Sequence, residues 1–157
     1  MGRMFTVEFN DVTVPASANF DAFELAPADD KVLIVHAIYL AQSNPLATTD
    51  EEMLRARIIR GHTSSGNGTA TTPVGVQSHG DTAGFTAKCG STTIASGGTT
   101  KTVHSDAFNN RSGWAMVFPP ELRPTIAQTQ TYLVVRLASP DAAQRLSGTM
   151  YVEEIGG

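Results

Sequence analysis

Two apolar runs organise the chain: Lys31–Leu40, KVLIVHAIYL, and Met53–Arg60, MLRARIIR. The first is rich in β-branched residues and has no Gly or Pro, which predicts a central strand buried on both faces. The second alternates, as a strand with one buried face does. Its inward set is Leu54, Ala56 and Ile58, and its outward set is Arg55, Arg57 and Ile59. We therefore expect the two runs to pair at the centre of one antiparallel sheet.

Further strands are expected on both sides of these runs. Arg3–Phe9 alternates with its aromatic residues on one face, and Phe20–Leu25 is a second short strand that ends before Pro27. Near the end of the chain, Thr129–Leu137 and Leu146–Glu154 show the same period of two. Each of these patterns predicts a strand that buries one face.

Glycine pairs and turn residues punctuate the middle of the chain. Gly90 with Ser91 separates 84–89 from 92–95, and Gly97 with Gly98 precedes 99–104, which predicts hairpins. Helical structure is limited to two expected single turns. One begins near Thr48 or Thr49, and the other covers Pro140–Arg145 with Ser139 as its N-cap.

This succession of about eight to ten short strands, without alternating helices, defines the expected fold class. It predicts an all-β protein, an antiparallel β-sandwich with a jelly-roll-like or Greek key topology. The 157 residues show no repeat and no linker, so we expect one domain over 1–157. Within it, residues 61–72 are almost entirely Gly, Ser and Thr and are expected to form a flexible loop that could order on a partner.

Composition narrows the functional classes. A net charge of -4 and 11 scattered Lys and Arg residues make nucleic-acid binding unexpected. The longest apolar run is about ten residues, half of what a membrane-spanning helix needs. The single cysteine, Cys89, and the lack of a secretory signal at the start favour synthesis in a reducing cytoplasm. The charged fraction of 17% is low, which favours a surface partly covered in an oligomer or a larger assembly.

No residue pattern predicts an active site, a cofactor or a metal. The four histidines lack metal-ligand spacing, and His36 is expected to be a hydrogen-bonded core residue. His62 lies near Ser64, but no strand–turn–helix elbow surrounds that serine. Trp114 and Phe118 precede a Pro-Pro pair and fit either an aromatic partner-binding patch or core packing.

Half of the residues that we predict to bind a partner are arginines, because Arg forms bidentate pairs that hold subunits in register. The predicted set is Arg55, Arg57, Arg60, His62, Ser64, Asn67, Trp114 and Arg123.

Nearly the whole chain resembles a group of small tailed-phage virion proteins of the head decoration or cement type. The stretches that carry the resemblance are Phe5–Phe9, Phe23–Lys31, Met53–His62, Gly84–Ala87, Ser105–Trp114, Glu121–Pro124 and Leu146–Glu154. The resemblance implies a non-enzymatic β-sandwich that binds the major capsid protein between capsomers on the outside of the phage head. It also implies a homo-oligomer, with a trimer favoured. The alternative is a receptor- or glycan-binding β-sandwich of a phage tail or baseplate.

Overall fold

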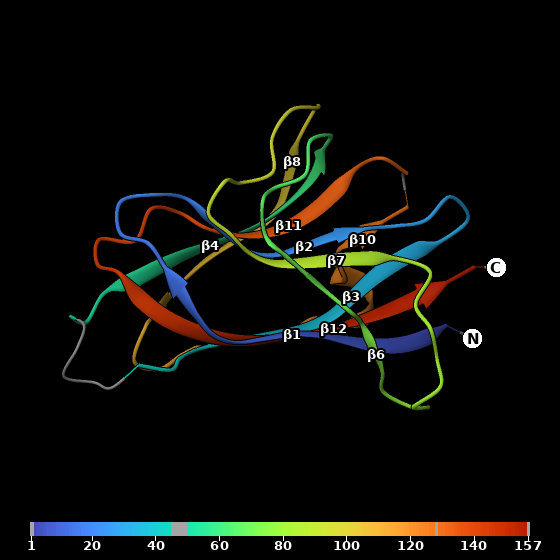
Figure 1. Ribbon diagram of the computed structural model, residues 1–157, viewed down its shortest axis with the longest axis horizontal. Helices are drawn as coiled ribbons and strands as arrows, with labels where there is room; N and C mark the ends of the chain where they lie inside the picture. Colours follow the sequence, from blue (N-terminus) through green and yellow to red (C-terminus); the bar gives the residue numbers. More distant parts are fainter. Residues whose placement is uncertain (1, 45–49, 128, 157) are drawn as a thin grey trace.

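The computed structural model describes residues 2–44, 50–127 and 129–156. Its strands form two antiparallel sheets that pack face to face (Figure 1), which confirms the predicted all-β sandwich. The strands are β1 (Arg3–Val14), β2 (Phe20–Ala26), β3 (Val32–Gln42), β4 (Met53–His62), β5 (Thr69–Thr71), β6 (Val74–Gly75), β7 (Thr86–Ser91), β8 (Lys101–Asn109), β9 (Trp114–Val117), β10 (Thr125–Ile126), β11 (Tyr132–Leu137) and β12 (Gln144–Ile155). A 3-10 turn, η2 (Pro120–Leu122), precedes β10.

The order of the longer strands is that of a jelly roll. Sheet A contains the order β1-β12-β3, with β9 paired to the free side of β3, and sheet B contains β2-β11-β4-β8. Consecutive strands β1 to β4 alternate between the sheets, and so do β8, β9, β11 and β12. Two interlocked Greek keys of this kind define the jelly roll. The sequence left this topology open between jelly roll and Greek key.

The core lies between the sheets and is built from the inward positions of the alternating strands. Phe9 of β1 packs on Phe23 of β2 with ring centroids 5.1 Å apart, which joins the two sheets. The largest fully buried side chains are Phe5, Phe20, Phe23, Leu25, Leu33, Ile38, Leu40, Leu54, Ile58, Leu133, Leu137 and Leu146. The predicted inward faces of the first and last strands are therefore confirmed.

The two organising runs lie in different sheets, so the expected pairing between them is wrong. β3 pairs with β12, β9 and β10 in sheet A, whereas β4 pairs with β11 and β8 in sheet B. β3 also buries one face only, and half-buried His36 contacts Glu153 on the outer face (Nε2 to Oε2, 2.8 Å). Hydrophobic periodicity shows which side chains point inward, but it does not choose between a neighbouring strand and a strand in the facing sheet.

Residues 63–100 form an insertion between β4 and β8. Its strands β5 and β7 extend sheet B beyond β2, and β6 pairs with β1. The expected hairpins at 84–104 are absent from this described segment, because β7 pairs with β2 and β5 while β8 pairs with β4. Gly97 and Gly98 both have positive φ, and the chain bends at Gly98.

Residues 61–72, expected to be a flexible loop, are hydrogen-bonded to sheet B. Thr69–Thr71 is strand β5, and the buried carboxylate of Glu24 on β2 accepts hydrogen bonds from the Ser65 hydroxyl (2.5 Å) and the Gly66 N–H (2.8 Å). A Cβ at Gly68 would lie only 2.8 Å from the carbonyl oxygen of Cys89. The polar composition of this segment predicted a flexible loop. The carboxylate that anchors the segment lies 42 residues away in the chain, so local composition does not reveal it.

Of the two expected helical turns, the one at 140–145 is absent from the described residues and the other falls outside them. Thr48 and Thr49 lie outside the described residues. Residues 140–145 are bent and then join β12, because the Glu52 carboxylate accepts the N–H of Asp141 (2.8 Å) and the side-chain amide of Gln144 (2.6 Å). Ser139, the expected N-cap, has a φ of 40°.

Candidate functional site

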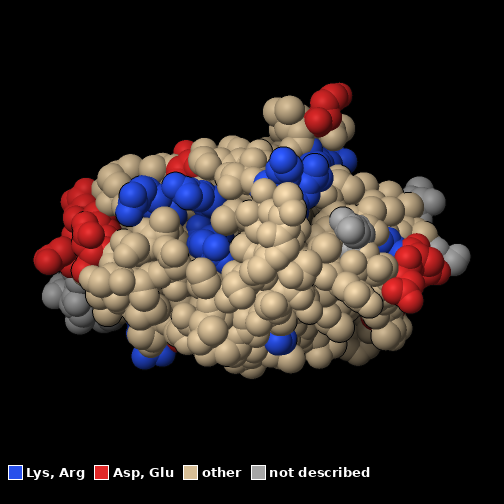
Figure 2. All heavy atoms as spheres, turned by 90° about the horizontal axis from the view of Figure 1, so that it is seen from above, with Lys and Arg blue, Asp and Glu red and all other residues tan. Residues whose placement is uncertain are grey.

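The outer face of sheet B carries the cationic residues of β4. In the strand register Arg57 is directly opposite Arg136 of β11 and Ser105 of β8, and Arg55 is opposite Ala107 of β8. Directly opposed residues of an antiparallel pair share a face, so these arginines all project from the outside of the sandwich. Figure 2 looks onto this side and shows Lys and Arg side chains gathered along it, with acidic side chains towards the two ends. We call Arg55, Arg57 and Arg136 the arginine face.

Arg136 is the anchored member of the arginine face. Its guanidinium donates two hydrogen bonds to the fully buried carboxylate of Asp21 (2.6 and 3.0 Å) and one to the carbonyl of Ala95 (2.8 Å). The second Asp21 oxygen also accepts the Ala95 N–H at 2.8 Å. This closed network fixes Arg136 and neutralises its charge.

No carboxylate among the described residues forms an ion pair with Arg55 or Arg57. Arg55 makes a long 3.5 Å contact with the carbonyl of Ala138. Across the described residues, Arg57 forms neither a hydrogen bond nor an ion pair. The nearby carboxylates of β2 are already satisfied, Asp21 by Arg136 and Glu24 by Ser65 and Gly66. The outer side of β4 can therefore attract an acidic surface electrostatically.

His62 ends β4 beside this network and is buried, with 6% of its surface exposed. Burial lowers the pKa of His62, and the positive charge of Arg136 lowers it further. The Gly97 backbone and the carboxylates of Asp21 and Glu24 oppose that shift. His62 therefore lies inside the sandwich behind the arginine face and exposes little surface to a partner.

The other predicted partner-binding residues are spread over the molecule. Ser64 and Asn67 are exposed on the insertion, where Ser64 bridges to Ser96 and the Asn67 side chain accepts the Thr93 N–H at 2.9 Å. Arg123 is half-buried after η2, with its Nε 3.4 Å from the carbonyl of Phe118. The structure brings Arg55 and Arg57 together on one face but does not place these three with them.

Arg60 and Trp114 also lie away from the arginine face. Arg60 is opposite the core residue Leu133 and therefore lies on the inner side of sheet B, at its end. Trp114 is only 6% exposed, stacks on Phe108 with ring centroids 5.8 Å apart and donates its indole N–H to Asp106. The Trp114 ring therefore packs in the core where β8 and β9 meet. Of the two interpretations of Trp114, a partner-binding patch or core packing, the structure confirms core packing.

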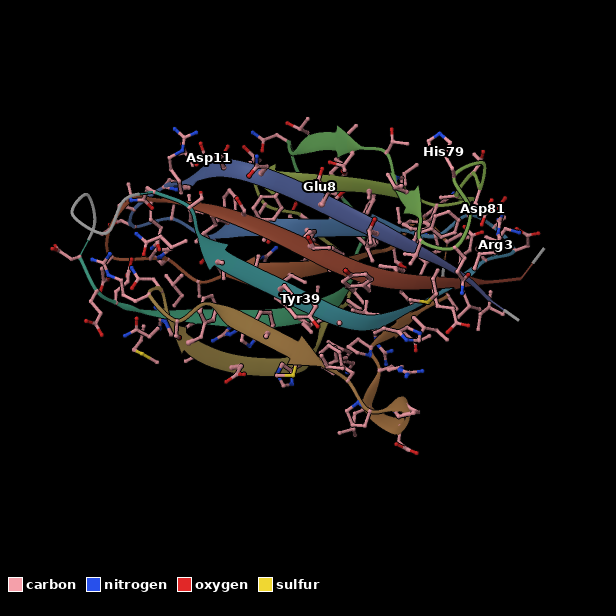
Figure 3. The ribbon with its side chains drawn as sticks, turned by 90° about the horizontal axis from the view of Figure 1, so that it is seen from below. Arg3, Glu8, Asp11, Tyr39, His79 and Asp81 are labelled. Carbon is pink, nitrogen blue, oxygen red and sulfur yellow. The ribbon has the colours of Figure 1, made fainter. Side chains whose placement is uncertain are left out.

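Sheet A presents a different outer face. Tyr39 of β3, 40% exposed, is opposite Ala115 of β9 and Thr149 of β12. Its ring meets that of Tyr151 edge-on, with centroids 6.1 Å apart. Figure 3 shows Tyr39 on this side of the molecule, with charged Glu8 and Asp11 along β1.

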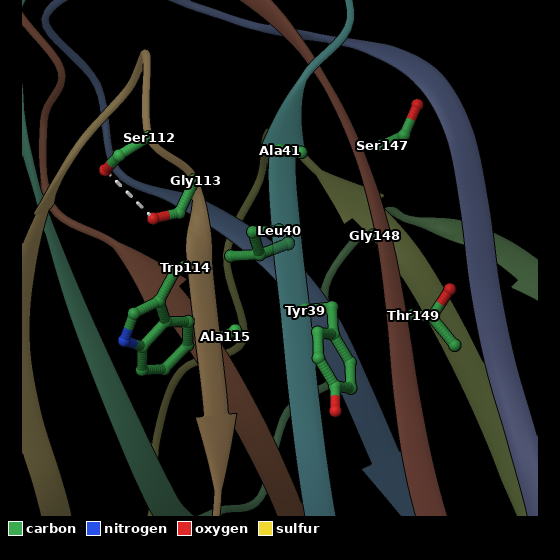
Figure 4. A pocket seen from close by; sticks show the side chains of 10 residues that line it. All are labelled: Tyr39, Leu40, Ala41, Ser112, Gly113, Trp114, Ala115, Ser147, Gly148 and Thr149. Carbon is green, nitrogen blue, oxygen red and sulfur yellow. Dashed lines mark hydrogen bonds between the residues drawn. The ribbon is translucent and has the colours of Figure 1, made fainter.

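A shallow pocket of about 410 Å³ adjoins Tyr39 on the same face. The hydroxyls of Ser112 and Thr149 and the small residues Gly113 and Gly148 contribute to its lining (Figure 4). Sequence reasoning missed this pocket because β3 was expected to be buried on both faces. The signals in the sequence were the polar residues His36 and Tyr39 inside an apolar run.

Among the described residues there is no cluster of three or more His, Cys, Asp or Glu side chains able to hold a metal. In the same part of the chain, no helix has the length and apolar character to span a membrane. Cys89 is buried, and burial raises the pKa of its thiol to about 11.

The described chain is thus an antiparallel jelly-roll β-sandwich with one cationic and one hydroxyl- and tyrosine-bearing face. Compared with protein-family models, curated proteins and solved structures, it matches none.

Proposed function

We propose that this protein is a non-enzymatic structural component of a tailed-phage virion, which binds the outside of the head and stabilises the capsid. The observation that carries the proposal is the arginine face, where Arg55 and Arg57 project from a rigid sheet without internal carboxylate partners. Electrostatic complementarity of this kind steers association and selects an acidic partner surface. The partner we propose is the major capsid protein, contacted between capsomers.

The stabilising effect needs no chemical step. A protein that binds the assembled shell, but not its dissociated subunits, lowers the free energy of the assembled state. Many copies on one particle add their contributions even where each contact is weak. A trimer, as the sequence resemblance implies, would multiply the contacts that each bound unit makes.

The fold is compatible with this role. Jelly rolls occur in viral capsid and lectin domains. Because one fold serves many functions, this is an analogy that supports the proposal without deciding it.

Two measurements test the proposal. Quantitative mass spectrometry of purified virions should find the protein in tens to hundreds of copies per particle, and its absence from virions would exclude the proposal. In a binding assay with particles that lack the protein, we expect Arg57→Gln to weaken binding several-fold. Arg145→Gln is the matched control, since it removes one exposed positive charge that pairs with Asp11 on the other sheet.

A receptor- or glycan-binding role on a tail or baseplate is the second candidate, and the pocket beside Tyr39 favours it. An exposed tyrosine edge next to serine and threonine hydroxyls suits a neutral, hydroxyl-rich ligand. Binding on a glycan array that Tyr39→Ala abolishes, together with only a few copies per virion, would support this role over head decoration.

A further inference from the structure

A second cationic feature lies at one end of the sandwich, away from the arginine face. Here β4, β8 and β10 border a pocket of about 340 Å³. Arg60, Gly61, Thr99 and Lys101 line it on the sheet B side, and Thr125 lines it from sheet A. The pocket therefore opens between the two sheets.

The Arg60 side chain is held at this pocket by both sheets. Arg60 is opposite Leu133, whose side chain is fully buried in the core, so Arg60 extends along the inner side of sheet B. Its Nη1 donates to the carbonyl of Thr125 on β10 at 2.9 Å. Gly61, with a φ of 99°, makes the bulge that follows Arg60 and leaves no side chain on that side of the pocket.

Lys101 is the direct register partner of Arg60 on β8. Two like charges in opposed positions of a sheet destabilise it unless something neutralises them. Across the described residues that line the pocket there is no Asp or Glu. Within the same described part of the chain, Lys101 has no hydrogen-bond or ion-pair partner, so both cations lack a counter-charge.

We propose that this pocket binds an oxyanion of the phosphate, sulfate or carboxylate class between Arg60 and Lys101. A guanidinium fixed at one nitrogen still offers further N–H groups, and an ammonium offers three. Thr99, whose side chain carries a hydroxyl, lines the same wall. The bound anion would remove the repulsion between the two cations and join β4 to β8. This inference is independent of the proposed function, because the pocket is separate from the arginine face.

Amide chemical shifts of the ¹⁵N-labelled full chain can test the site. Sodium phosphate and sodium acetate are titrated separately against sodium chloride at constant ionic strength. Saturable shifts centred on Gly61, Thr99 and Lys101 are expected. Saturation by phosphate alone would identify a phosphate-type ligand, and saturation by acetate as well would extend the site to carboxylates.

Three variants separate the pocket from general surface charge. Arg60→Gln and Lys101→Gln should each weaken binding about tenfold, since each removes a charged donor. Arg57→Gln loses the same charge from the arginine face and should bind like the wild type. Shifts that do not saturate in the wild type, or equal weakening by Arg57→Gln, would overturn the proposal. Because Lys101 has no internal partner, its variant stays informative if Arg60→Gln fails to fold.

Discussion

At the scale of single residues, the interior behind the arginine face contains a buried histidine, His62. Its folded-state pKa lies below the ordinary value of 6.5 because burial and the neighbouring Arg136 disfavour the imidazolium. The unfolded chain therefore binds a proton to His62 at a higher pH than the folded chain does.

This difference predicts a loss of stability as the pH falls below about 6.5, the reference value for His. Above that pH His62 is neutral in both states and contributes nothing. Below it the loss grows, by about 1.4 kcal/mol for each pH unit that separates the two pKa values, and levels off under the folded pKa. Urea unfolding at pH 7 and pH 5 measures the effect.

His62→Gln should flatten this pH dependence, because glutamine does not titrate. His79→Gln, at an exposed position in the insertion, is the matched control and should keep it. An equal slope in wild type and His62→Gln would show that other groups cause the pH dependence.

At the scale of elements, the insertion 63–100 is held to sheet B by acids of β2. Glu24 lies next to Lys88 in the register, and Lys88 donates to the Ser65 hydroxyl (2.7 Å) that in turn donates to Glu24. Asp21 binds the Ala95 N–H in the same way. Because Gly66 and Ala95 are buried as well, their N–H groups have no water to replace the two carboxylates.

Glu24→Ala is therefore expected to lower the free energy of unfolding by about 1–3 kcal/mol, since it leaves the Gly66 N–H unpaired. Hydrogen exchange should accelerate at Gly66 and Gly68, while the amides of β12 stay protected. Glu8→Ala, on the exposed side of β1, should change neither quantity by more than about 0.5 kcal/mol. Unchanged exchange at Gly66 in Glu24→Ala would contradict this anchoring.

The elements also show what the sequence could predict and what it could not. Alternation placed Phe5 and Leu54 inward, and the fold class followed from such short strands. It did not reveal that β3 and β4 face each other across the core, because inward periodicity is the same for either arrangement. The arginines of β4 were found by the same alternation. Arg60 was wrongly grouped with Arg55 and Arg57. Its separate position depends on the bulge at Gly61 and on the hydrogen bond to Thr125, which are contacts distant in sequence.

At the scale of the whole molecule, the charged side chains are distributed unevenly over the two outer faces and the ends. The chain as a whole carries a net charge of -4, yet sheet B presents Arg55 and Arg57, which form no ion pair among the described residues. Sheet A presents Tyr39 of β3 and Thr149 of β12. No lysine or arginine lines the pocket beside these two residues. If the protein binds the acidic partner proposed above, this distribution favours one orientation, with sheet B facing the partner and sheet A facing away from it.

This orientation predicts that binding to virions depends on salt. Exposed charges are screened beyond about 10 Å at 0.1 M salt and about 3 Å at 1 M. The affinity for particles that lack the protein should therefore fall several-fold between 0.05 and 0.5 M NaCl, mainly through slower association. Arg55→Gln with Arg57→Gln should reduce the salt dependence, whereas Arg145→Gln should retain it.

Hydrogen exchange on bound particles should show new protection in β4 and β8 and none around Tyr39. Protection of sheet A instead, with binding indifferent to salt, would reverse the orientation and favour the pocket beside Tyr39 as the contact surface.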